Sequence, residues 1–278
     1  MADQHPSPVV TNPWHHLRRY TDARIGLGRA GISLPTQQLL EFQLAHARAR
    51  DAVHLPLDID RLTGDLASLP GLTEPGEPVL LHSQAADRFQ YLQRPDLGRR
   101  LDEASRERLA DRASANGADL ALVVVDGLSS SAIQANVAPF LACFLDALGQ
   151  TEPDWRLAPL TVVQQGRVAI GDDIGQLLSA RAVVVLIGER PGLSSPDSVG
   201  IYLTWNPKPG LTDASRNCIS NVRPAGLSFD QASERLIYLL REAHRLGLSG
   251  VGLKDRTGEV VIDSSTNNKN FLTNDGQS

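Results

Sequence analysis

Two apolar stretches constrain the fold of this chain most strongly. Residues 118–125 (Ala-Asp-Leu-Ala-Leu-Val-Val-Val) and 182–188 (Ala-Val-Val-Val-Leu-Ile-Gly) are apolar at nearly every position. A strand with one face in water alternates polar and apolar residues, whereas a strand of a parallel sheet is covered on both faces and is apolar throughout. Helical patterns alternate with such strands along the chain, so we expect a mostly parallel sheet covered by helices on both faces. Only 5% of the residues are aromatic, so aliphatic side chains must fill the core.

The first half of the chain is predicted to be mainly helical. A helix is expected from Thr36, its predicted N-cap, to about residue 52, and Pro56 ends it. Its single apolar stripe is formed by Leu40, Leu44 and Ala47. Glycines and prolines between 64 and 78 indicate turns, and a second helix is expected near 99–115.

Helices and strands alternate in the second half. A helix to about residue 148 follows the first apolar stretch, with Ser129 or Ser130 as its cap and Pro139 as a kink. A helix over 229–246 has Ser228 as its cap, Gln231 as the other half of a capping box, and Gly247 as its stop. The other expected elements are strands at 160–164, 167–170, 199–205, 217–222 and 249–253 and a helix at 172–180.

These elements predict an α/β fold, in which a Rossmann-like, mostly parallel sheet domain follows a small helical N-terminal domain. We expect a flexible N-terminus at 1–13, the helical domain at 14–112, the Rossmann-like domain at 113–256 and a flexible tail at 257–278.

Charge and composition exclude several classes of function. A net charge of −5 does not suggest a nucleic-acid partner. The longest uninterrupted apolar run, at 182–188, is far shorter than the ~20 residues of a membrane span, and the N-terminus lacks the layout of a secretory signal. The two cysteines, Cys143 and Cys218, fit free thiols in a reducing compartment. We therefore expect a soluble intracellular protein.

Two candidate sites have simple structural alternatives. Gly-Leu-Gly-Arg-Ala-Gly at 26–31 matches the dinucleotide fingerprint. That fingerprint needs a strand before it and a helix directly after it, but no strand is expected before residue 26 and Pro35 delays the next helix. A tight loop or a partner contact is therefore favoured over NAD or FAD binding. Asp-Gly-Leu-Ser at 126–129 follows a buried strand, where α/β sheets gather ligands. A well-capped strand-to-helix turn explains the same residues.

Two further segments combine charged or nucleophilic side chains. Glu189 follows the second apolar stretch and either accepts hydrogen bonds from a ligand or pairs with Arg190 or Arg223. Cys218 lies in an alternating stretch, and a buried cysteine usually acts as a small hydrophobe. A nucleophilic role would need a nearby base such as His244 or His46.

The sequence contains no complete catalytic constellation. It lacks cysteines and histidines at zinc-ligand spacing and lacks a phosphate-binding loop. It also lacks the Asp-x-His-x-x-Gly stretch that supplies a histidine to cobalt in some corrinoid proteins. We therefore expect no catalytic residue and no protein metal ligand in this chain.

Four segments together closely resemble the small subunit of ethanolamine ammonia-lyase. They are Arg-Ile-Gly-Leu-Gly-Arg-Ala-Gly at 24–31, Tyr-Leu-Gln-Arg-Pro-Asp-Leu-Gly-Arg-Arg at 91–100, Gly-Glu-Arg-Pro-Gly-Leu at 188–193 and Arg-Asn-Cys-Ile-Ser-Asn at 216–221. The resemblance covers roughly residues 14–255 and is specific because all four segments occur in the same order.

The resemblance implies an adenosylcobalamin-dependent enzyme that converts ethanolamine to acetaldehyde and ammonia by a radical mechanism. It implies a hetero-oligomer in which a large barrel subunit holds the substrate, the corrin lies between the subunits, and residues 113–256 contact it. The family's cobalamin contacts match Val168, Glu189 and Cys218 here. Dimethylbenzimidazole stays on the cobalt, so no protein histidine is needed, and we expect Cys218 on that side, away from the adenosyl group.

The resemblance also implies a cytoplasmic enzyme, or one inside a bacterial microcompartment where the organism makes one. The N-terminal region is shorter than in relatives whose extra residues direct encapsulation, which leaves that targeting open. Two alternatives remain: a stand-alone, Rossmann-type NAD-binding oxidoreductase that uses residues 26–31, and a scaffold subunit that contacts no cofactor.

Overall fold

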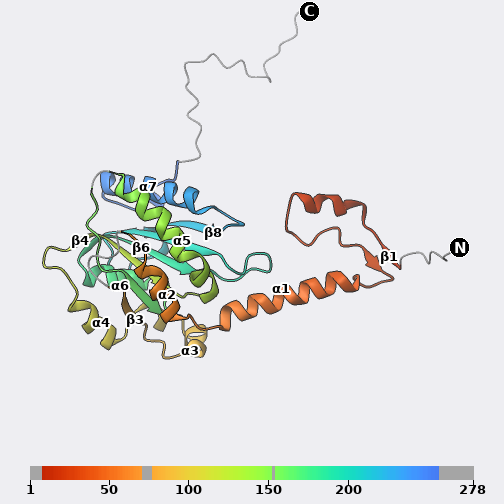
Figure 1. Cartoon of the computed structure of the whole chain (residues 1–278), viewed down its shortest axis with the longest axis horizontal. Coiled ribbons are helices and arrows are strands. Elements are labelled where there is room, and N and C mark those ends of the chain that lie inside the picture. The colour runs from red at the N-terminus through yellow and green to blue at the C-terminus, as the bar shows by residue number, and fades with distance from the viewer. Residues whose placement is uncertain (1–7, 71–76, 152–153, 257–278) are drawn as a thin grey trace, which may run out of the picture.

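A six-stranded sheet forms the centre of the molecule. The computed structural model describes residues 8–70, 77–151 and 154–256 (Figure 1). The strand order is β3-β5-β4-β6-β7-β8; the first four strands are parallel, and β7 and β8 extend the sheet antiparallel. The strands are β3 (Val79–His82), β4 (Ala118–Val125), β5 (Thr161–Gln164), β6 (Ala180–Gly188), β7 (Val199–Trp205) and β8 (Arg216–Val222). The predicted α/β class with a mostly parallel sheet is confirmed.

The side chains of β4 divide between two hydrophobic cores. Leu122 and Val124 belong to one core, whereas Val123 and Val125 belong to the other. Successive side chains of a strand point to opposite faces, so each face of the sheet has its own core. This double coverage is the physical reason that β4 and β6 are apolar at nearly every position.

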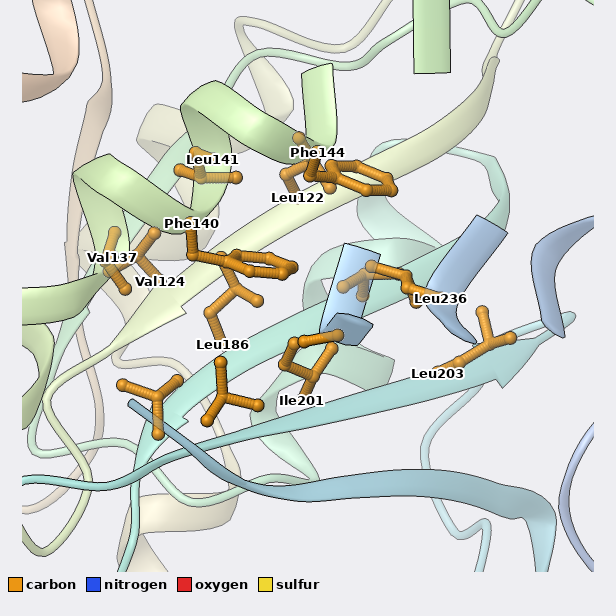
Figure 2. Packing of buried hydrophobic residues seen from close by; sticks show 14 of the residues in the cluster. Leu122, Val124, Val137, Phe140, Leu141, Phe144, Leu186, Ile201, Leu203 and Leu236 are labelled. Carbon is orange, nitrogen blue, oxygen red and sulfur yellow. The ribbon is translucent and has the colours of Figure 1, made fainter. Parts of the chain in front are cut away.

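Helices cover both faces of the sheet. On one face α5 (Ser130–Gly149) packs against α7 (Phe229–Leu246), and Figure 2 shows Phe140 and Phe144 of α5 beside Leu236 of α7. Burying one such side chain contributes about 1.5–3 kcal/mol. The other face is covered by α4 (Glu103–Ala110) and α6 (Ile170–Leu177).

The predicted ends of α5 and α7 are confirmed. The Ser129 side chain accepts a hydrogen bond from the backbone of Ala132, and the Ser228 side chain accepts one from the backbone of Gln231. Among the described residues the Gln231 side chain makes no returning bond to Ser228, so the predicted capping box is only half formed. Gly247 ends α7 with φ of 70°. Among the described residues, α5 is the one helix that is long and apolar enough to cross a membrane, but half of its apolar stretch is buried in the fold. We interpret α5 as the core helix of a globular domain.

The strand β3 was not expected from the sequence. It lies beside β5 at the edge of the main sheet, with Val79 and Leu81 buried. The helix α2 (Ile59–Ala67) also contributes Leu62 and Leu66 to the core under α5. The predicted boundary at 112/113 therefore does not separate these elements from the sheet. Four residues that follow a turn-rich stretch are too few for a periodic pattern to reveal.

The helix α1 (Thr36–His54) projects from the body of the molecule and carries residues 8–35 at its far end (Figure 1). Its helical prediction is confirmed, but the predicted cap is wrong: Thr36 is the first helical residue, Pro35 occupies the cap position, and no side-chain cap bond forms. The predicted apolar stripe contacts no core, since Ala52 is the one buried residue of α1. We call residues 8–54 the N-terminal arm.

Several short elements differ from expectation. Residues 167–169 form a turn that leads into α6 rather than a strand, and the last expected strand is a 3-10 turn, η4 (Gly250–Gly252). Within the N-terminal arm, β1 (Val9–Val10) pairs with β2 (Arg29–Ala30), and η1 (Pro13–Arg19) lies between them. Short α3 (Arg88–Gln93), η2 (Leu97–Arg99) and η3 (Asp213–Ser215) complete the elements. The predicted tail at 257–278 and the first seven residues lie outside the described residues.

Candidate functional site

Buried Asp126 organises the loops at the carboxyl ends of the parallel strands. It follows β4 directly, and its carboxylate accepts hydrogen bonds from the backbone of Gly127 (2.8 Å), Gln165 (2.9 Å) and Gly166 (3.2 Å). Burial raises the pKa of this carboxyl, against the effect of these bonds and of Arg88. Asp126 therefore holds the turn together, as the structural alternative for residues 126–129 predicted.

Gly127 brings β4 and β6 together at this edge. Its φ is +60°, and a Cβ atom there would lie 2.3 Å from the carbonyl oxygen of Gly188. Only glycine combines this backbone conformation with such close approach. The turn thus places the start of the loop after β6 directly beside the loop after β4.

Two of the three predicted cofactor residues share one cavity. This cavity, which we call the sheet-end cavity, has a volume of about 380 Å³ and contains both Val168 and Glu189 in its wall. Val168 comes from the loop after β5, and Glu189 comes from the end of β6. The other wall residues are Tyr91, Leu128, Arg167, Ile187, Gly188, Arg190, Tyr202 and Ser220.

Glu189 is held by β8 rather than by an arginine. Its carboxylate accepts hydrogen bonds from Ser220 Oγ (2.6 Å) and from the backbone of Asn221 (3.2 Å). Arg223, a predicted alternative partner, instead contacts Asp197 at 3.3 Å. A carboxylate has about four lone-pair sites, so these two bonds fix Glu189 and leave it able to accept from a ligand.

Cys218 lies beside the cavity, opposite Tyr202 in the β7–β8 ladder. The residue as a whole is exposed, but neighbouring atoms partly desolvate the thiol, and this raises its pKa, as does Glu189. The two histidines that sequence reasoning offered as bases pack elsewhere: His244 contacts Trp155 and Trp205, and His46 contacts Phe42. A protonated thiol without such a base does not suit a nucleophile.

Tyr91 and Arg167 of the sheet-end cavity wall belong to a stack of one aromatic and two cationic side chains. The guanidinium groups of Arg88 and Arg167 lie 4.7 Å and 4.0 Å from the ring centre of fully buried Tyr91. Burial raises the pKa of Tyr91, so its hydroxyl stays protonated at neutral pH. The Tyr91 hydroxyl and Arg167 Nε are buried with no hydrogen-bond partner among the described residues.

A second cavity of about 580 Å³ adjoins the first, since Val168 and Arg167 line both. Its wall contains one buried ion pair and the buried carboxylate of a second pair. Arg216 binds Asp172 through two hydrogen bonds of 2.6 and 2.7 Å, and Asp173 pairs with Arg106. We call this space the arginine cavity, and its other wall residues are Pro95, Arg99, Arg100, Ala169, Pro209, Gly210, Leu211, Thr212 and Asp213.

Sequence reasoning singled out neither Tyr91 nor the arginines of these walls. The signal was present in the segment 91–100, which carried part of the family resemblance and which provides Tyr91, Arg99 and Arg100. No group of three or more metal-ligating side chains occurs in the described part of the chain.

The segment 26–31 has a geometry unlike that of a dinucleotide fingerprint. It lies in the N-terminal arm, where β2 falls within the motif itself, and the following helix, α1, begins only at Thr36. Gly26, Gly28 and Gly31 have φ values of +60°, +78° and +60°. These values fit the tight loop that the sequence favoured.

Comparison with known proteins agrees with the resemblance. A sequence model of the family "Ethanolamine ammonia-lyase light chain (EutC)" matches residues 11–254. The ethanolamine ammonia-lyase small subunit of Pseudomonas fluorescens (strain SBW25) is 58% identical over 257 residues, which cover 91% of this chain and 90% of that one. The small subunit of Pseudomonas putida (strain W619) is 56% identical, covering 97% and 98%. That of Ralstonia nicotianae is 53% identical, covering 97% of each. This chain therefore belongs to the family of ethanolamine ammonia-lyase light chains, also called small subunits.

Proposed function

We propose that this chain is the cofactor-holding subunit of an adenosylcobalamin-dependent ethanolamine ammonia-lyase, which converts ethanolamine to acetaldehyde and ammonia. In this proposal the cobalamin lies between this chain and a large subunit that holds the substrate. The observation that carries it is the sheet-end cavity, where Val168 and Glu189 from different loops line one space beside Cys218. This chain then binds the cofactor and carries no catalytic residue.

The residues present fit a cobalamin. The molecule has an apolar corrin plane and a rim of amides, and sites for such ligands combine apolar surface with a few well-placed polar groups. Val168 offers apolar surface, and Glu189 offers acceptor oxygens to a rim amide or a ribose hydroxyl. The Tyr91 hydroxyl and Arg167 Nε offer donors that the described residues leave unpartnered.

When bound, adenosylcobalamin supplies a cobalt–carbon bond whose cleavage begins radical chemistry. The residues of this chain orient the cofactor and exclude water from its covered face. The position of Cys218 relative to the adenosyl group matters because thiols donate hydrogen atoms readily to carbon radicals. We place its sulfur on the dimethylbenzimidazole side, away from the adenosyl group, and a structure with this sulfur beside the adenosyl C5′ carbon would contradict that placement.

The proposed partner is a large subunit. Extensive exposed apolar surface on a protein usually marks an interaction site. The N-terminal arm exposes Trp14 (64%), Tyr20 (73%), Ile32 (105%) and Leu40 (59%), none of which finds cover within the described chain. This surface supports a chain that completes its packing in a complex. The name "small subunit" of the relatives supports the same view.

Equilibrium binding of hydroxocobalamin to the complex of this chain with a large subunit tests the proposal. Glu189→Ala should weaken binding about tenfold, because it removes an acceptor and leaves ligand donors unpaired. Glu234→Ala is the matched control, since Glu234 is exposed on α7. Wild-type affinity in Glu189→Ala would instead support a scaffold without cofactor contact. Tight binding of NAD by the isolated chain would support the oxidoreductase alternative.

We also propose that the complex works in the cytoplasm. The free thiols of Cys143 and Cys218 suit a reducing compartment. Enclosure in a microcompartment, where the organism makes one, remains a prediction that fractionation of cells grown on ethanolamine would test.

A further inference from the structure

Four arginines and three aspartates line the arginine cavity, so the cations of its wall outnumber the anions. Its three carboxylates each face an arginine: Asp172 binds Arg216 and Asp173 pairs with Arg106, while Asp213 lies 3.6 Å from Arg216 Nε. The remaining wall cations are therefore not matched by wall anions.

Arg99 and Arg100 provide this excess charge. Both are exposed and line the cavity, and within the described residues neither side chain has a hydrogen bond or an ion pair. Arg167 makes a hydrogen bond to the carbonyl oxygen of Tyr91 at 3.0 Å, but its Nε is buried and unpartnered. Arginine matches phosphate oxygens in shape as well as charge, and such charge-assisted bonds are strong. The chemistry of this wall therefore suits a phosphate group.

Val168 and Arg167 line both cavities, so the cavities lie side by side and a ligand as large as a cobalamin could extend over both. A cobalamin carries a single phosphodiester in its nucleotide tail, at a distance from the corrin plane. We propose that Arg99 and Arg100 bind this phosphodiester in the arginine cavity while the corrin side of the ligand lies at the sheet-end cavity. This assignment rests on the proposed function, since it names a second part of the same ligand.

The test compares two ligands that differ in the tail. Dicyanocobinamide keeps the corrin ring but lacks the phosphate, ribose and dimethylbenzimidazole of hydroxocobalamin. Both are titrated into the complex of this chain with a large subunit, and affinity is measured from the corrin absorbance. The double variant Arg99→Ala/Arg100→Ala is compared with Arg235→Ala/Arg241→Ala, which removes the same charge from exposed positions of α7.

The double variant at 99 and 100 should weaken hydroxocobalamin binding by about tenfold or more, because two charge-assisted contacts are lost. Its affinity for dicyanocobinamide should stay unchanged, and the control variant should bind both ligands normally. Rising salt should weaken hydroxocobalamin binding in the wild type more than in the double variant. Arg99→Lys/Arg100→Lys, which keeps the charge, should recover part of the affinity.

Equal weakening of both ligands, or of neither, would overturn the assignment. A variant that binds hydroxocobalamin normally but loses binding of inorganic pyrophosphate would assign the cavity to a separate phosphate ligand and would also overturn it. The failure of the proposed function is a different result. In that case Glu189→Ala has no effect on hydroxocobalamin either, or the wild-type complex binds no cobalamin.

Discussion

Removing the charge of Asp172 should destabilise the fold strongly. Both oxygens of its carboxylate accept a hydrogen bond from the Arg216 guanidinium, and the two side chains are only 2% and 3% exposed. The pair connects the first turn of α6 to the start of β8, which carries Cys218 and Ser220. Asp172→Asn keeps the shape and leaves the Arg216 charge buried with poor compensation.

Removing one partner of a buried ion pair costs about 3–5 kcal/mol. We expect the lower end of that range, because Arg216 keeps hydrogen bonds to Thr204 Oγ1 (3.1 Å) and the Leu211 carbonyl (3.2 Å), and because exposed Asp213 lies 3.6 Å from its Nε. A domain is stable by only about 5–15 kcal/mol, so this loss is a large fraction of the total.

Urea denaturation of the full chain, followed by circular dichroism, measures the effect. The midpoint should fall by about 1 M or more, given the usual slopes for proteins. Asp119→Asn is the control, because the partner Arg156 is 60% exposed and such pairs contribute only ~0–1 kcal/mol. The double variant Asp172→Asn/Arg216→Met should cost less than the sum of the single variants. A loss below about 1 kcal/mol for Asp172→Asn would refute the reasoning, since it would mean that the charge is not buried and paired as described.

Two further predictions concern the turn at Gly127 and the thiol of Cys218. Gly127→Ala should destabilise the chain by about 2 kcal/mol or more through backbone strain and contact with Gly188. The control Gly149→Ala, at a position with open space around it, should be neutral or stabilising by up to ~1 kcal/mol. Equal effects of the two variants in urea denaturation would contradict this account of the turn. In a Cys143→Ser background, alkylation of Cys218 by iodoacetamide should reach half its maximal rate at a higher pH than that of a cysteine peptide, because the raised pKa reduces the thiolate fraction at each pH. A midpoint below that of the peptide would indicate an activated thiol and would contradict our interpretation.

The sequence predicted the elements whose signals are local. The apolar runs of β4 and β6 follow from coverage of both sheet faces, and Ser129, Ser228 and Gly247 act as helix ends because their bonds involve residues within a few positions. The strand β3 was missed because its identity depends on pairing with β5, about 80 residues away. The helix predicted from the apolar stripe of α1 does form. Periodicity does not reveal, however, whether the same chain provides a surface to cover the stripe.

The candidate site was only partly accessible to sequence reasoning. Glu189 was identified from its position after a buried strand, whereas Val168 entered only through the family resemblance. The sequence also left open whether Glu189 pairs with an arginine, because its actual partners, Ser220 and Asn221, are brought to it by the β7–β8 hairpin. Tyr91 in α3 and Arg167 in the loop after β5 are about 75 residues apart and meet only in the folded chain, so no local pattern could indicate their stacking.

A structure of the complex of this chain with a large subunit and bound cobalamin tests the central claim most directly. We expect the corrin at the sheet-end cavity, within contact distance of Val168 and Glu189, with Cys218 on the dimethylbenzimidazole side. A corrin bound wholly by the large subunit, or one remote from the carboxyl ends of β4, β5 and β6, would contradict the account.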